Sequence, residues 1–170
     1  MKYSFAKYYF LLILSSSLIF SCNSTPKKNE KSKVFSLGVI VNNPDDIQKV
    51  LSAFYKCYTG DTAGIRQLYA DTAIVYDNMV PLTINKLIGI CQPNNSDGMV
   101  SKLDSSYFIQ EVRYNKPYRG FKTWVQIWGY RISTNKHKRV QKVALHCDFA
   151  FQNGKIISEY DYYDPNMGFE

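Results

Sequence analysis

Histidines, metal-ligand motifs and long apolar runs are scarce in this sequence, and each scarcity excludes a class of protein. His137 and His146 are the only histidines, and no cysteine pair has the spacing of metal ligands, so we expect neither a metal nor another cofactor. The apolar run over residues 8–20 is far shorter than the roughly 20 residues that a membrane-spanning helix needs. A transmembrane protein is therefore not expected.

A basic surface for nucleic acid is also missing. The formal charge of +7 falls to +2 once residues 1–33 are set aside, because that part carries six lysines and one glutamate. No stretch interleaves lysine, arginine and aromatic residues, and residues 136–139 have the pattern of a solvated hairpin tip. Nucleic acid is therefore not an expected partner.

The N-terminus has the pattern of a signal peptide, because Lys2 and Lys7 precede the short apolar run. The end of that run, Leu18-Ile19-Phe20-Ser21-Cys22, resembles the lipobox of bacterial lipoproteins. The resemblance implies a signal peptide over residues 1–21 and an acylated Cys22 that anchors the protein to a lipid membrane of the bacterial cell envelope. Asn23 is not the aspartate of inner-membrane retention, which favours the outer membrane. Ordinary secretion with nearby cleavage is the alternative.

Residues 22–33 are predicted to form a flexible tether, since they offer no apolar side chains that could repay the entropy of ordering. Residues 34–170 suit one domain with a single core. This domain has three cysteines, Cys57, Cys91 and Cys147, so at most one internal disulfide is possible. We expect them to be small buried hydrophobic residues.

Two helices and a strand are expected first. Apolar residues recur at helical spacing after Pro44 and predict a helix that ends near Gly60. Asp61 is expected to cap a shorter helix, which leads into a strand over residues 73–76, and residues 83–89 are a candidate third helix. Residues 93–104 are polar and predict a loop.

Long strands dominate the C-terminal third. Residues 107–114, 123–133, 138–151 and 155–163 are rich in aromatic and β-branched residues. Asn153-Gly154 between the last two is a strong signal for a two-residue hairpin turn. Helices followed by a meander of strands predict an α+β fold, with helices packed on one face of a curved sheet.

The order of these motifs resembles the SnoaL-like, nuclear-transport-factor-2-like (NTF2-like) superfamily over residues 44–164. The resemblance implies a cone-shaped curved antiparallel sheet with the N-terminal helices on its concave face. Residues 60–78 are most similar to ketosteroid isomerase, which puts Asp77 at the position of the proton-abstracting carboxylate. The isomerase's oxyanion tyrosine is replaced by Ala53, and His146 stands where the isomerase has a protonated carboxylic acid, so steroid isomerisation is not expected.

Pairing around Asn153-Gly154 predicts which side chains share a face. If Gln152 faces Lys155, then Asp148 lies opposite Glu159 and His146 opposite Asp161. These residues share one face of the hairpin, a mixed face of polar and aromatic side chains. If the loop around Asn135 has an odd number of residues, the aromatic residues of the preceding strand lie on the same mixed face. Its candidate members are Trp124, Trp128, Tyr130, Asp148, Glu159 and Tyr163, together with His146 and Asp161.

The opposite face of the same hairpin is apolar, with Val143, Leu145, Cys147, Phe149 and Phe151. Pattern alone makes this apolar face the core. The resemblance instead places the pocket on Glu159, Asp161 and Tyr163. We favour a mixed face that lines the pocket and an apolar, convex face that forms a homodimer.

Asp77, His146 and Asp161 are the candidate catalytic residues. Asp77 is a candidate base, and His146 with Asp161 resembles the His–Asp pair of polyketide cyclases, which implies proton transfer of the isomerase or cyclase type. Each also has a purely structural interpretation, as a strand-end hydrogen bond or a surface pair. We expect binding of a small hydrophobic ligand or a protein partner without turnover, and keep the enzyme as the alternative.

Overall fold

The computed structural model describes residues 38–41, 44–91, 99–164 and 166. The predicted signal peptide, the tether and Cys22 therefore lie outside the described residues. Ser36–Glu170 forms one compact unit, and all residues of the buried core belong to it. None of the helices in the described ranges has both the length and the apolar character that crossing a membrane requires.

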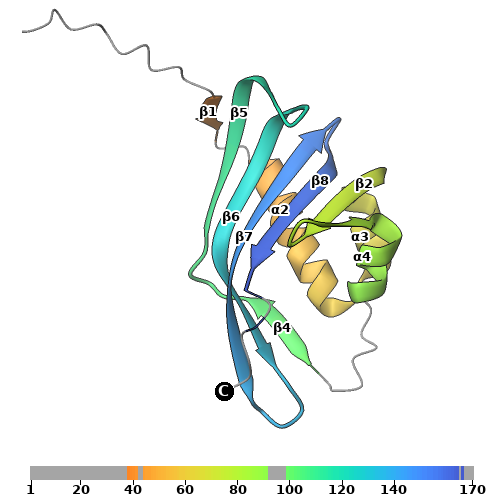
Figure 1. Cartoon of the computed structure of the whole chain (residues 1–170), viewed down its shortest axis with the longest axis vertical. Helices are drawn as coiled ribbons and strands as arrows, with labels where there is room; N and C mark the ends of the chain where they lie inside the picture. The colour runs from red at the N-terminus through yellow and green to blue at the C-terminus, as the bar shows by residue number, and fades with distance from the viewer. Residues whose placement is uncertain (1–37, 42–43, 92–98, 165, 167–170) are drawn as a thin grey trace, which may run out of the picture. The chain divides into compact units, whose positions relative to one another are not determined.

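An eight-stranded curved sheet forms the larger layer of this unit (Figure 1). Its main path runs β1-β5-β6-β7-β8-β2-β3, and β4 pairs with β6 beyond the end of β5. All neighbouring pairs are antiparallel except β2 and β8. The strands are β1 Gly38–Val41, β2 Tyr69–Asp77, β3 Val80–Thr83, β4 Val100–Leu103, β5 Phe108–Tyr118, β6 Phe121–Thr134, β7 Val140–Gln152 and β8 Lys155–Tyr163.

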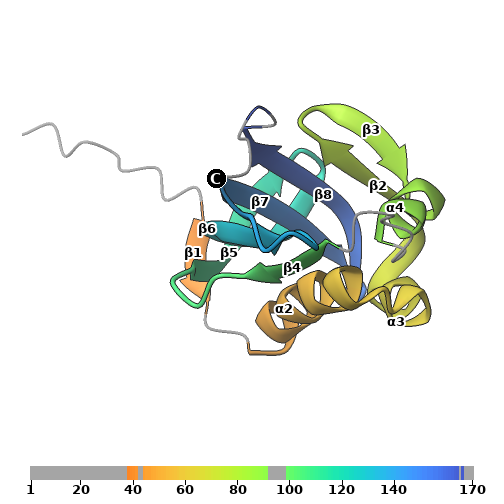
Figure 2. The same ribbon diagram turned by 90° about the horizontal axis from the view of Figure 1, so that it is seen from below.

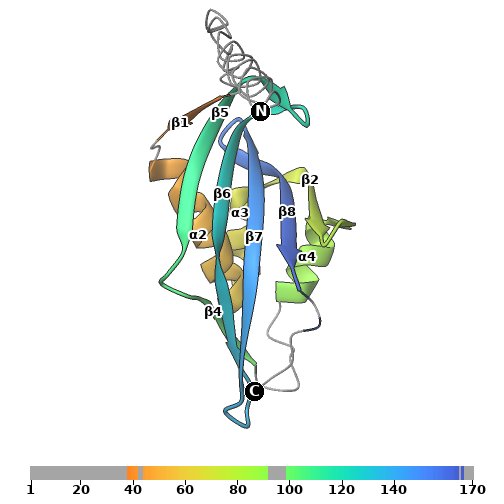
Figure 3. The same ribbon diagram turned by 60° about the vertical axis from the view of Figure 1, so that its left-hand side comes forward.

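Three helices form the second layer, on the concave face of the sheet (Figures 2 and 3). They are α2 Pro44–Thr59, α3 Thr62–Leu68 and α4 Ile84–Cys91. Asp61 caps α3 as predicted, since its side chain accepts a hydrogen bond from Gly64 N at 2.8 Å. Side chains of α2, such as Val50 and Ala53, pack against Phe149 and Ile127 of the sheet to form the core. This confirms the α+β cone fold.

Several predicted boundaries need correction. The strand expected over residues 73–76 is longer, because β2 begins at Tyr69 directly after α3. Part of the predicted loop over residues 93–104 is strand β4, which pairs with the end of β6. Its four residues alternate half-buried and exposed, and such a short pattern is hard to recognise in sequence. The edge strands β1 and β3 were not predicted, because each is also only four residues long.

The two predicted hairpins are present. Asn153 and Gly154 both have positive φ, 51° and 74°, as a two-residue turn of the primed type requires. Thr134 pairs with Val140, so the preceding loop has five residues, an odd number. This loop length puts Trp124 and Trp128 on the same face as His146, as expected.

The register of the last hairpin differs from the prediction. Gln152 faces Lys155 and Phe151 faces Ile156, but Ala150 faces Ser158, so Ile157 has no partner in β7. This bulge shifts every later residue of β8 by one position relative to β7. Because a shift of one residue exchanges the two faces of a strand, it decides which side chains of β8 reach the concave side.

Candidate functional site

A cavity of about 150 Å³ lies between the concave face of the sheet and the helices. Its walls are mostly apolar. The apolar lining residues are Ala53, Phe54, Ile65, Val75, Leu82, Leu87, Ile90, Val143, Leu145 and Phe149. The polar or ionisable ones are Tyr58, Tyr69, Asp77, Arg131, Cys147, Glu159, Asp161 and Tyr163, beside the disulfide-bonded Cys57.

The bulge in β8 brings its acidic residues into this cavity. Glu159 lies opposite Phe149, Asp161 opposite Cys147 and Tyr163 opposite Leu145, all on the concave face. Val143, Leu145, Cys147 and Phe149 line the same cavity. The apolar face of β7 is thus the core, as pattern alone indicated. The expectation that this face packs against a second subunit was wrong.

His146 and Asp161, the expected catalytic pair, are separated by the sheet. His146 lies opposite Tyr162, on the convex face, and Asp161 lies on the concave face. The His146 Nε2 atom is 3.0 Å from Asp148 Oδ1, and the imidazole stacks on Trp128 with 4.7 Å between ring centroids. The predicted pairing was wrong because it assumed a hairpin without a bulge.

The other aromatic candidates lie on the convex face as well. Trp124 and Trp128 are neighbours of Ala150 and His146 across the β6–β7 pair, and Tyr130 lies opposite Ala144. Trp124 is only 1% exposed, because Tyr118, Phe121 and Tyr160 surround it. None of Trp124, Trp128, Tyr130, Asp148 and His146 lines the cavity, whereas Asp77, Glu159, Asp161 and Tyr163 do.

Glu159 and Asp161 form a coupled carboxyl pair in the cavity. The buried Tyr69 donates a hydrogen bond to Glu159 Oε2 at 2.5 Å. Burial, and after it the charge of Asp161, raises the pKa of Glu159 well above its usual range. Burial also raises the pKa of Asp161, to about 6, although hydrogen bonds from Cys147 and Glu159 oppose the rise. Burial thus favours the protonated form of both carboxyl groups.

Asp77 joins the pair from the neighbouring strand. It is the parallel-register partner of Asp161, so both side chains reach the same face at adjacent positions. Tyr163 interacts with Asp77, and burial followed by this hydrogen bond raises the pKa of Tyr163 to about 12. Three carboxyl groups thus meet in an otherwise apolar cavity, which is the environment in which acid–base residues acquire perturbed pKa values.

Arg131, Tyr58 and Tyr69 were missed by the sequence analysis. Arg131 lies over the Tyr163 ring at 5.5 Å, and its buried Nε atom has no hydrogen-bond partner. Burial raises the pKa of Tyr58 and keeps its hydroxyl protonated. The sequence does contain a signal for Arg131. Every second residue of β6, such as Val125, Ile127 and Ser133, faces the same side as Arg131, and Arg131 is the one charged residue among them.

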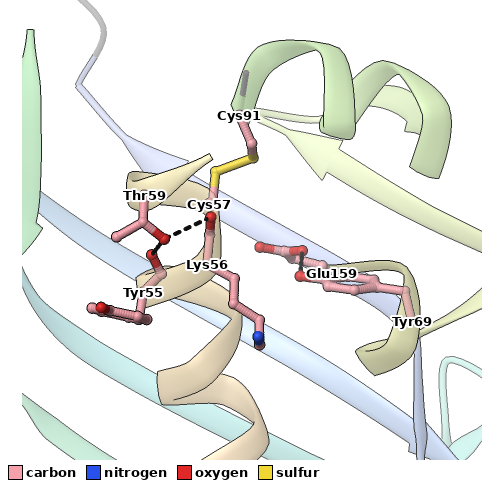
Figure 4. The surroundings of a disulfide bond; sticks show 7 residues. All are labelled: Tyr55, Lys56, Cys57, Thr59, Tyr69, Cys91 and Glu159. Carbon is pink, nitrogen blue, oxygen red and sulfur yellow. Dashed lines mark hydrogen bonds between the residues drawn. A yellow bond between two sulfur atoms is a disulfide. The ribbon is translucent and has the colours of Figure 1, made fainter. Parts of the chain in front are cut away.

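A disulfide joins Cys57 and Cys91, beside the cavity (Figure 4). It connects α2 to the last residue of α4, and Cys57 lines the cavity. The sequence allowed one internal disulfide, and Cys57 and Cys91 form it, whereas Cys147 is the small buried thiol that was expected. Within the described ranges no group of three histidine, cysteine or acidic residues is arranged to hold a metal ion.

No protein-family model matches the sequence, and no curated protein is significantly similar to it. Solved structures do resemble the fold. An NTF2-like protein from Burkholderia xenovorans is 14% identical with a TM-score of 0.52, over 71% of this chain and 90% of that one. An LEH-like epoxide hydrolase from M. tuberculosis is 12% identical with a TM-score of 0.52, over 73% and 86%.

A third example is a protein with a ketosteroid isomerase-like fold from Catenulispora acidiphila, 13% identical with a TM-score of 0.52, over 71% of this chain and 88% of that one. These similarities show that the chain has the cone fold of NTF2-like proteins. Because this class hosts many unrelated activities, the likeness shows the fold alone.

Proposed function

We propose that this protein is a lipid-anchored envelope protein whose cavity binds a small, mostly apolar molecule with one polar group. The observation that carries the proposal is the composition of the cavity, whose apolar walls enclose a polar cluster on β2, β6 and β8. A cavity of about 150 Å³ is large enough for a single six-membered ring. Few polar groups in a mostly apolar pocket are typical of small-molecule sites.

The membrane anchor is the part of this proposal that depends on sequence alone. Lys2, Lys7, the short apolar run and Cys22 support an acylated N-terminus. Cys22→Ser should move the protein from the membrane fraction to the soluble fraction of cells. A Ser24→Ala control should remain in the membrane fraction. Localisation in the outer membrane is to be checked by separating the two membranes on a density gradient.

Proton transfer is the second candidate function, and the carboxyl group cluster favours it. Burial raises the pKa of Glu159 well above its usual range, and Asp77 is the strand neighbour of Asp161. A protonated acid next to a carboxylate can supply an acid and a base to one bound substrate, as isomerases and cyclases require. His146 is left out of this mechanism, because it lies on the other face of the sheet.

A ligand screen on residues 36–170 separates the two candidates. Small alcohols, aldehydes and ketones with a single ring would be tested for a rise in melting temperature, and mixtures would be analysed for conversion by mass spectrometry. Asp77→Asn is the informative variant, and Asp71→Asn is its control, since Asp71 is an exposed residue of the same strand. Stabilisation without conversion supports binding. Conversion that is lost only in Asp77→Asn supports the enzyme, and no stabilisation by any compound contradicts both.

A homodimer through the convex sheet face remains part of the proposal, on a new basis. The apolar face of β7 is internal, but the convex face presents Phe108 and Tyr130, which are 59% and 40% exposed. Aromatic side chains are enriched in the cores of protein interfaces. Sedimentation of residues 36–170 as a monomer at tens of micromolar would contradict the dimer.

A further inference from the structure

Arg131 presents an unpaired donor to the cavity. It extends from β6 on the concave face, between Val143 of β7 and Leu103 of β4. It lines the cavity, and its Nε atom is buried without a hydrogen-bond partner. A buried N–H without an acceptor is unfavourable, because it has lost its hydrogen bond to water. A ligand atom that accepts a hydrogen bond from this N–H would offset that loss.

Asp161 presents an unpaired acceptor to the same cavity. Cys147 and Glu159 hydrogen-bond to its carboxyl group, but Oδ1 is buried without a partner. The neighbouring Tyr69 donates to Glu159 and thereby holds the carboxyl pair in place. Arg131 is close enough to lower the pKa of Asp161, although the two side chains form no ion pair within 4.0 Å. One unpaired donor and one unpaired acceptor thus belong to residues that line the same cavity.

The charges of the cavity select a neutral ligand. The groups that face Asp161 are Tyr58 from α2, Tyr69 and Asp77 from β2, Arg131 from β6, Cys147 from β7, and Glu159 and Tyr163 from β8. Carboxyl groups and a guanidinium thus face the same cavity. A ligand carboxylate would lie beside the carboxyl groups of Asp77 and Asp161, and a ligand ammonium group would lie beside the guanidinium of Arg131, whereas a neutral group that both donates and accepts a hydrogen bond meets no like charge.

We infer that the ligand carries a hydroxyl group, which accepts a hydrogen bond from Arg131 and donates one to Asp161. A hydroxyl has one donor and two acceptor positions, whereas a ketone or an ether can only accept. The inference rests on the proposed small-molecule pocket and adds to it the chemical class of the ligand.

A matched series of ligands tests the inference on the unaltered residues 36–170. Toluene, benzyl alcohol, benzaldehyde, benzoate and benzylamine share one ring of a size that suits the cavity and differ only in the polar group. Affinities would be measured at pH 7.5 by calorimetry or by ligand-observed NMR. Benzyl alcohol should bind about tenfold more tightly than benzaldehyde, which can accept a hydrogen bond but not donate one, and by a larger factor than toluene, which can do neither. Benzoate and benzylamine should bind more weakly than benzyl alcohol.

Two variants test whether Arg131 and Asp161 cause the preference for benzyl alcohol over toluene. Arg131→Met and Asp161→Leu should each reduce the ratio of benzyl alcohol to toluene affinity about tenfold, because each removes one hydrogen bond, while toluene still binds. Arg66→Met and Asp71→Asn are the controls, since both residues are exposed and neither lines the cavity. Melting curves would establish that each variant is folded, and the wild-type series does not depend on them.

The outcomes distinguish the inference from the function on which it rests. Equal binding of toluene and benzyl alcohol would overturn the hydroxyl inference and leave the apolar pocket intact, with water on the two unpaired atoms. Tighter binding of benzoate or benzylamine, or a preference that is undiminished in both variants, would overturn it as well. Failure of the whole series and of larger alcohols to bind would contradict the pocket itself, and the inference would fall with it.

Discussion

Breaking the Cys57–Cys91 disulfide should destabilise the fold strongly. The two cysteines are 34 residues apart in sequence, and their bond connects α2 to the end of α4 across α3, β2 and β3. Reduction therefore frees a loop that contains a quarter of the sheet's strands and part of the cavity wall. The perturbation is reduction, or the double variant Cys57→Ala/Cys91→Ala.

The expected magnitude follows from chain entropy. A cross-link that closes a loop of about 34 residues removes about 13 cal/mol/K from the unfolded chain, which amounts to about 4 kcal/mol at 25 °C. Domains of this size are stable by about 5–15 kcal/mol. Loss of the disulfide should thus remove a quarter or more of the total stability, and the cavity side of α4 should open first.

Urea unfolding with and without a thiol reductant measures this difference. Titration of thiols in the unfolded, unreduced residues 36–170 should detect one free thiol, that of Cys147. The double variant should match the reduced protein and should not respond to reductant, which separates loss of the bond from other effects of reduction. Three free thiols before reduction, or a stability difference below about 1 kcal/mol, would refute the reasoning.

Three further predictions concern the polar residues. Burial raises the pKa of Asp161 from 3.8 to about 6, so the folded state binds more protons than the unfolded state between these two pH values. The free energy of unfolding should therefore fall as the pH rises from about 4 to about 6. The urea midpoints of Asp161→Asn should lack this fall. Tyr69→Phe should lower the free energy of unfolding by about 1–3 kcal/mol, because it leaves Glu159 Oε2 without its hydrogen-bond donor. In the same urea assay, Tyr55→Phe at an exposed position should leave the stability unchanged. His146→Gln should leave the affinity of the cavity for any ligand unchanged in calorimetry, because His146 lies on the convex face, and a loss above about threefold would contradict this placement.

Local patterns explain why the helices and long strands could be predicted. Apolar residues at helical spacing define α2, and Asp61 marks the start of α3, because caps and periodicity depend only on near neighbours in sequence. The turn at Asn153-Gly154 is likewise a property of two residues that tolerate positive φ. The apolar alternation of β7 correctly indicated the core side of the sheet.

The candidate site was predicted in part, and the bulge accounts for the rest. Asp77, Glu159, Asp161 and Tyr163 do line the cavity, as the family resemblance implied. His146 and the tryptophans do not, because the one unpaired residue, Ile157, exchanges the faces of β8 relative to β7. A bulge depends on how two whole strands twist and pack, so no short sequence motif predicts it.

By itself the sequence determined the class of fold, the long strands and the hairpin turns, since these follow from periodicity, turn residues and composition. Only the tertiary structure decided the register of β8, the pairing of Cys57 with Cys91, and the placement of Arg131 and Asp161 in one cavity. The physical reason is that these features join residues far apart in the chain, and their distances are set by the packing of the sheet against the helices.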